Sequence, residues 1–191
     1  MSAGNARGVS SESFEPLVLA MKKAAATLRE GQVPFFLAGG LASWARGGPP
    51  REHDVDFMLM EQDVERAADL LAADGFRVER PPEAWLIKAY DGDVLVDLIH
   101  CPTGLPVDEA MIERADEMEV NAVRMRVMAA DDILVTKLLS LGEHSADYEA
   151  VLEVGRSLRE QIHWDDVRER TAESPWARAY FTLVDGLGIA A

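Results

Sequence analysis

The chain has 191 residues, of which 48% are hydrophobic and 28% are charged, a composition typical of one soluble globular domain with a buried core. The single cysteine, Cys101, excludes a disulfide framework and cysteine-based zinc sites. The formal net charge is −15, and all of the excess lies after residue 60; such acidity repels a polyanion and argues against bulk nucleic-acid binding.

The first residues do not have the pattern of a targeting signal, and we expect none. Residues 1–12 are rich in Gly, Ser and Ala, and we expect them to be disordered. They lack the apolar stretch of a secretory signal, and no apolar run approaches the roughly 18 residues of a membrane span. We therefore expect a cytoplasmic protein without a membrane partner.

Helix and strand patterns alternate up to residue 73. Helical spacing of apolar residues and short apolar runs bounded by glycine and proline distinguish the two kinds of element. The predicted elements are a helix over 14–30, a strand over 33–38, a short helix over 41–46, a strand over 55–60 and a helix over 62–73.

Beyond residue 75 the pattern has period two and then becomes helical. Strands are predicted over 76–79, 85–90, 94–100 and 120–128, with Asp91-Gly92 as a hairpin signal between the second and third. Apolar stripes at helical spacing follow from Ala130 to the end of the chain. The sequence therefore predicts an α/β domain over residues 13–128 and a helical region over 129–191.

Two carboxylates stand two residues apart at the start of the strand over 55–60. Asp54 and Asp56 flank Val55, and residues i and i+2 of a strand point to the same face. The two charges therefore lie side by side, where burial without a partner would be costly. Carboxylate oxygens are hard ligands suited to Mg²⁺, so a divalent cation would satisfy both.

A third carboxylate, Asp97, interrupts the apolar run Val94–Ile99. If this strand lies beside the strand of Asp54 and Asp56, three carboxylates converge and one or two Mg²⁺ ions fit among them. Two such ions activate an attacking oxygen and neutralise a leaving phosphate. Lys88, on the preceding strand, is expected to be exposed.

Two glycines, Gly39 and Gly40, join the strand over 33–38 to the short helix. Taken alone, they are also compatible with a tight turn. Beside a metal site they suggest a phosphate cradle, because Gly40 lets backbone N–H groups approach an anion at a helix N-terminus. A phosphate cradle next to carboxylate-bound metal is the equipment for phosphoryl or nucleotidyl transfer.

This order of motifs resembles the polymerase-β-type nucleotidyltransferase superfamily over roughly residues 33–160. Five residues fall on its motif positions: Gly39, Gly40, Asp54, Asp56 and Asp97. The segment over 51–56 is similar to that of small antibiotic adenylyltransferases acting on aminoglycosides or lincosamides. Residues 132–187 look more like the AbiEii/MenT group of toxin-type nucleotidyltransferases, whose late acidic position only Asp147 can fill.

The resemblance implies an α/β (α+β) nucleotidyltransferase fold, a small mixed sheet flanked by helices with a C-terminal helical region. It implies an enzyme that transfers an NMP from an Mg-NTP to an acceptor hydroxyl and releases pyrophosphate. Asp54 and Asp56 would hold the metals, and Asp97 would complete the second metal site and act as general base. The nucleotide-binding residues would be Gly39, Gly40, Ser43, Arg51 and Lys137.

Several alternatives stay open. Lys137 also fits a surface lysine on an amphipathic helix, and Arg51 also fits a counter-charge to the nearby acidic residues. The acceptor can be a small molecule, RNA or a protein, and any of the four NTPs can be the donor. A toxin with an antitoxin partner, and a nucleotide- or partner-binding module without turnover, are the two alternative functions.

Overall fold

The computed structural model describes residues 11–49 and 54–190. Its strands are β1 (Phe36–Leu37), β2 (Asp54–Met58), β3 (Arg77–Glu79), β4 (Leu86–Asp91), β5 (Val94–Ile99), β6 (Asp116–Val120) and β7 (Val123–Val127). Its α-helices are α1 (Ser11–Glu30), α2 (Gly39–Ala45), α3 (Glu61–Ala73), α4 (Glu109–Arg114), α5 (Ala130–Leu139), α6 (Tyr148–Ser157), α7 (Trp164–Arg170) and α8 (Pro175–Gly186). No helix of the described ranges is both long and apolar enough to cross a membrane.

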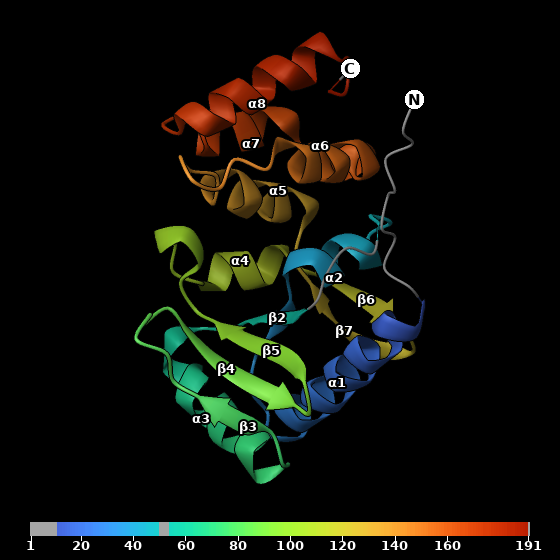
Figure 1. Cartoon of the computed structure of the whole chain (residues 1–191), viewed down its shortest axis with the longest axis vertical. Helices are drawn as coiled ribbons and strands as arrows, with labels where there is room; N and C mark the ends of the chain where they lie inside the picture. Colours follow the sequence, from blue (N-terminus) through green and yellow to red (C-terminus); the bar gives the residue numbers. More distant parts are fainter. Residues whose placement is uncertain (1–10, 50–53, 191) are drawn as a thin grey trace, which may run out of the picture.

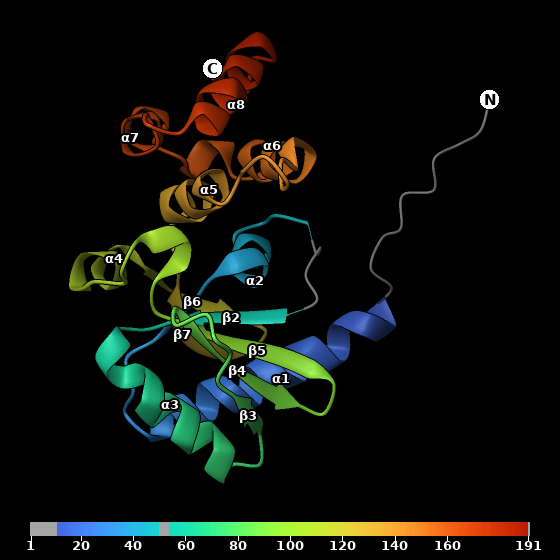
Figure 2. The same ribbon diagram turned by 60° about the vertical axis from the view of Figure 1, so that its left-hand side comes forward.

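The strands form one mixed sheet in the order β3-β4-β5-β2-β1-β7-β6 (Figure 1). Helices α1 and α3 lie on one side of this sheet, and α2, α4 and the helices α5–α8 lie on the other (Figure 2). The predicted fold class, a mixed sheet flanked by helices with further helices at the C-terminal end, is confirmed. The domain boundary at residues 128 and 129 stays a prediction.

The strands β2 and β5 form the centre of the sheet and run parallel, with Asp56 opposite Asp97. Alternate residues of both strands are fully buried and belong to the main core, on the side of α1 and α3: Val55, Phe57, Val96 and Leu98. Because side chains alternate between the faces of a strand, the aspartates between these residues point to the opposite face. Core packing therefore determines which face carries the carboxylates.

The first strand is shorter than predicted. The apolar run over 33–38 forms a strand only at Phe36–Leu37. The N–H of Val33 donates to the carbonyl of Leu28 and closes the end of α1, and Pro34 has no N–H to give to a ladder. The helix after it starts at Gly39 rather than at residue 41, so both glycines belong to α2.

The strand predicted over 120–128 is present but shorter, at Val123–Val127, and it is the second strand of a hairpin whose first strand was not predicted. Strands β6 and β7 pair antiparallel with Val120 opposite Val123. Asn121 and Ala122 form the turn with φ of 48° and 66°, as a type I′ turn requires at both central residues. The turn contains no glycine and β6 is acidic, so neither gave a sequence signal. Helix α4 was also missed, because its six residues are too few to show a helical period.

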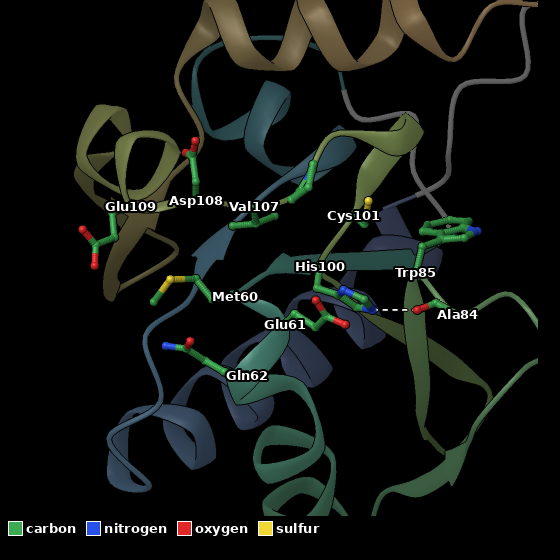
Figure 3. Close-up of a pocket in the computed structure, with 11 residues that line it drawn as sticks. Met60, Glu61, Gln62, Ala84, Trp85, His100, Cys101, Val107, Asp108 and Glu109 are labelled. Carbon is green, nitrogen blue, oxygen red and sulfur yellow. Dashed lines mark hydrogen bonds between the residues drawn. The ribbon is translucent and has the colours of Figure 1, made fainter.

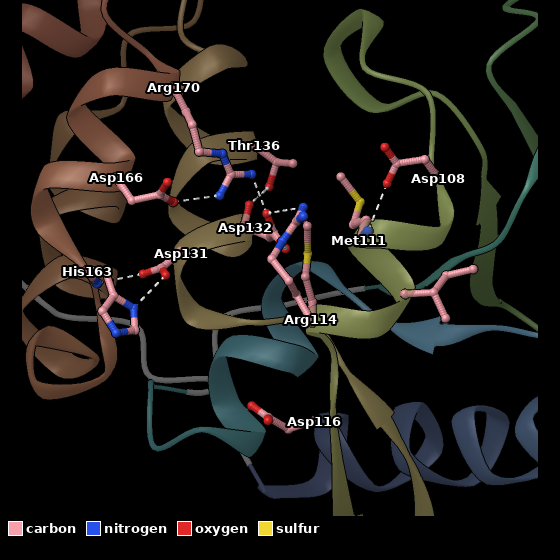
Figure 4. Close-up of polar contacts among 12 residues, drawn as sticks. Asp108, Met111, Arg114, Asp116, Asp131, Asp132, Thr136, His163, Asp166 and Arg170 are labelled. Carbon is pink, nitrogen blue, oxygen red and sulfur yellow. Dashed lines mark hydrogen bonds and ion pairs between the residues drawn. The ribbon is translucent and has the colours of Figure 1, made fainter.

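An ion-pair network around one buried aspartate joins the C-terminal helices to α4 (Figure 4). Asp132, on α5, is fully buried. Nε and Nη2 of Arg114, on α4, donate to its carboxylate over 2.9 and 3.1 Å, and Arg170, on α7, also donates to it. Both oxygens of this carboxylate accept hydrogen bonds from guanidinium groups, and these bonds compensate for the cost of burying its charge.

Candidate active site

Three carboxylates converge on the face of the sheet that carries α2. One oxygen each of Asp54, Asp56 and Asp97 lies within 4.8 Å of the others. Asp54 and Asp56 are half-buried at the start of β2, and Asp97 is 8% exposed in the middle of β5. The predicted convergence is therefore present.

Asp97 is the unusual member of this cluster. Its Oδ1 is buried and accepts no hydrogen bond within the described ranges. Burial raises the pKa of Asp97 to about 6, the ammonium of Lys88 acts against that rise, and the charge of Asp54 adds to it. A buried carboxylate oxygen without a donor next to two further carboxylates is an environment that a cation would complete. The hard oxygen ligands fit Mg²⁺.

Gly39 packs directly against this cluster. Its φ is +59°, and a Cβ placed on it would lie 1.8 Å from Oδ2 of Asp56. The preceding N–H, that of Ala38, donates to the carbonyl of Asp56 over 2.8 Å. Any side chain at position 39 would therefore both strain the backbone and displace the carboxylate. The glycine signal reflects this close approach rather than a turn alone.

A small cavity of about 190 Å³ lies where α2 meets α5 and α6. Its lining residues are Gly40, Ser43, Pro49, Lys137, Asp147, Ala150, Glu153 and Val154. Ser43 is 3% exposed, and its Oγ makes no hydrogen bond among the described residues. Three of the predicted nucleotide-binding residues, Gly40, Ser43 and Lys137, are thus brought together from segments almost a hundred residues apart.

Arg51, Asp147 and Lys88 are the remaining sequence candidates. Arg51 lies outside the described residues. Asp147 lines the same cavity as Ser43 and Lys137, and it caps α6, where its carboxylate accepts a hydrogen bond from the N–H of Ala150 over 3.1 Å. The prediction that Lys88 is exposed is wrong, because Lys88 is half-buried and stands opposite Asp97 on the neighbouring strand β4. The position of Lys88 next to Asp97 could have been predicted from the sequence, because the two-residue hairpin loop after Asp91 fixes the register of β4 and β5.

A larger cavity, of about 810 Å³, contains none of the predicted site residues (Figure 3). It lies beyond the ends of β2 and β5 and is lined mainly by apolar side chains, with Trp85 42% exposed on its wall. The His100 ring on the same wall is hydrogen-bonded to the carbonyl of Ala84 over 2.8 Å. Sequence patterns gave no signal for this cavity, because its walls come from four separate segments.

Comparison with known proteins identifies the family. The structure is similar to the crystal structure of ANT(2″)-Ia in complex with adenylyl-2″-tobramycin, with a TM-score of 0.62 at 18% identity over 85% of this chain and 98% of that chain. It is also similar to an antigenic nucleotidyltransferase-like protein from Paracoccidioides brasiliensis, with a TM-score of 0.56 at 16% identity over 93% and 90% of the two chains. No curated protein matches the sequence. Residues 51–185 match the family model described as uncharacterised nucleotidyltransferase, and because this match covers more than half of the chain, the protein belongs to that nucleotidyltransferase family.

Proposed function

We propose that the protein is a metal-dependent enzyme that transfers an NMP from an Mg-NTP to an acceptor hydroxyl. The acceptor oxygen forms a bond to the α-phosphorus, the bond from that phosphorus to the bridging oxygen of the β-phosphate breaks, and pyrophosphate leaves. The observation that carries the proposal is the convergence of three carboxylates within 4.8 Å of one another, one of them with a buried oxygen that has no hydrogen-bond donor in the described ranges.

The carboxylates have distinct proposed roles. Asp54 and Asp56 would hold one or two Mg²⁺ ions, and Asp97 would complete the second site. Bound Mg²⁺ supplies neutralisation of phosphate charge and activation of the acceptor oxygen. Asp97 would also take the proton of the acceptor hydroxyl. The remaining catalysis is orientation of the two substrates and stabilisation of charge.

The cavity between α2 and α5 is the proposed site of the triphosphate. The Oγ–H of Ser43 can donate to a phosphate oxygen, and Lys137 brings positive charge to the same cavity. Gly39 lets the backbone at the start of α2 lie close to Asp56, and Gly40 lines the cavity itself. Arg51, outside the described ranges, is a further proposed phosphate contact.

The donor and acceptor are best searched for among ATP and small hydroxyl compounds first. The similar ANT(2″)-Ia was crystallised with an adenylylated tobramycin, which motivates this order. The net charge of −15 disfavours an RNA acceptor. An RNA or protein acceptor, and with it a toxin that has an antitoxin partner, would be indicated instead by growth arrest on expression.

Calorimetric titration of each NTP with Mg²⁺ into the wild type and Asp56→Asn tests the proposal. We expect one nucleotide to bind only with Mg²⁺ and to lose that binding in Asp56→Asn. Asp165→Asn, an exposed carboxylate on α7, is the matched control and should bind like the wild type. The nucleotide that binds is then used in labelled form to screen acceptors. Absence of binding for all four nucleotides would contradict the proposal and favour a binding module without turnover.

A further inference from the structure

One basic side chain lies in line with the carboxylates across the sheet. Lys88 on β4 stands directly opposite Asp97 on β5, and Asp97 stands opposite Asp56 on β2. Residues directly opposite in neighbouring strands point to the same face, with about 5 Å between one strand and the next. Lys88 therefore shares the face of the carboxylate cluster and lies next to its most buried member.

The charge of Lys88 acts on Asp97, whereas the residue on its other side has a different cationic partner. Glu79, opposite Lys88 on β3, forms an ion pair with Arg77. Lys88 itself has no ion pair within 4.0 Å among residues 11–49 and 54–190. Its ammonium favours the ionised form of Asp97 and opposes the effect of burial on the pKa. The interaction is one of charge across a short distance rather than a formed contact.

The balance of charges at the carboxylate cluster predicts how Lys88 affects the number of bound cations. Three ionised carboxylates carry three negative charges, of which one divalent cation neutralises two and Lys88 neutralises the third. A second divalent cation in the absence of nucleotide would leave two uncompensated positive charges in a half-buried site, which is unfavourable. A bound triphosphate would bring the negative charge that a second cation needs.

We propose that Lys88 is a positioning residue that limits the nucleotide-free site to one divalent cation by supplying a fixed positive charge beside Asp97. The inference rests on the proposed function, because it assumes that the three carboxylates bind metal. It goes beyond that function in two ways. It assigns a role to a residue outside the motif, and it predicts that the second divalent cation binds only together with the nucleotide.

Counting free Mn²⁺ by electron paramagnetic resonance during titration of the nucleotide-free protein tests this inference. We expect the wild type to bind one ion, and Lys88→Met to bind it about tenfold more tightly and to take up a second. Lys88→Arg keeps the charge and should restore the wild-type behaviour. Lys22→Met removes an equal charge from α1, on the other side of the sheet (Figure 2), and should change neither the affinity nor the number of ions.

The outcomes separate this inference from the proposed function. Wild-type affinity and stoichiometry in a folded Lys88→Met protein, with binding lost in Asp56→Asn, would overturn only the role of Lys88. Equal Mn²⁺ binding by the wild type and Asp56→Asn would overturn both, because the carboxylates would then hold no metal. A merely structural role of Lys88 predicts weaker metal binding on its removal, which is the opposite sign.

Discussion

Two buried aspartates in this protein have opposite surroundings. Asp97 is 8% exposed and has one oxygen without a hydrogen-bond partner among the described residues. Asp132 is 0% exposed and accepts hydrogen bonds from Arg114 and Arg170. Burying a charge is costly unless it is paired, so Asp132 is explained by the fold alone whereas Asp97 is not. The difference separates a carboxylate that the fold itself satisfies from one that the fold leaves with a buried oxygen lacking a donor in the described part of the chain.

Replacement of Asp97 by Asn should give the largest effect on activity. We expect Asp97→Asn to lower the rate of pyrophosphate release by about 1,000-fold or more, because the proposed metal ligand and base are removed together. The Tm of the metal-free protein should rise at pH 8. Its raised pKa of about 6 means that Asp97 stabilises the fold at low pH, and that this contribution is lost as the pH rises through 6. A lower Tm with retained turnover would contradict the proposed role.

The corresponding change at Asp132 should lower the stability of the protein and leave nucleotide binding unchanged. Asp132→Asn leaves two guanidinium groups without their shared carboxylate (Figure 4), and we expect a loss of about 3 kcal/mol in the free energy of unfolding. Urea denaturation followed by circular dichroism measures this loss. The protein that remains folded should bind nucleotide with unchanged affinity. A loss of nucleotide affinity without a loss of stability would remove the distinction between the two aspartates.

The same contrast explains which parts of the molecule were predictable. Asp54, Asp56 and Asp97 break apolar strand patterns, and a broken pattern is visible in a single sequence. Asp132 follows Asp131 at the start of a helix, where acidic residues are common, so its burial depends on Arg114 and Arg170 reaching it from distant segments. The hairpin of β6 and β7 was missed because its turn uses Asn121 and Ala122 rather than glycine. Residues that interrupt a local pattern could be predicted from the sequence, whereas contacts between distant segments could not.

Ser43 offers a smaller test of the same reasoning. Its Oγ is buried without a partner in the described part of the chain, like Oδ1 of Asp97. Ser43→Ala should therefore leave the Tm unchanged or slightly raised, since no hydrogen bond within the fold is lost. The affinity for the NTP should fall about fivefold to tenfold, the effect of losing one hydrogen bond to a charged phosphate. Thr182, whose Oγ1 donates to the carbonyl of Arg178 on α8, provides a control as Thr182→Val, which should not change nucleotide binding.

The smallest expected effect concerns the neighbour of Asp132. Nδ1 of His163 lies 2.8 Å from Oδ2 of Asp131, and this hydrogen bond and charge raise the pKa of His163. A raised pKa means that the interaction stabilises the fold below the unfolded pKa of about 6.5 and loses that effect as the pH rises through the folded pKa. The wild type should therefore have a slightly higher Tm than His163→Gln at pH 5.5, and the difference should vanish by pH 8.5. The backbone N–H of His163 also donates to Asp131. Because a backbone N–H does not titrate in this range, His163 stays next to the start of α5 at both pH values. A Tm difference that is constant with pH would show that the backbone contact, rather than the ring, holds this end of α5.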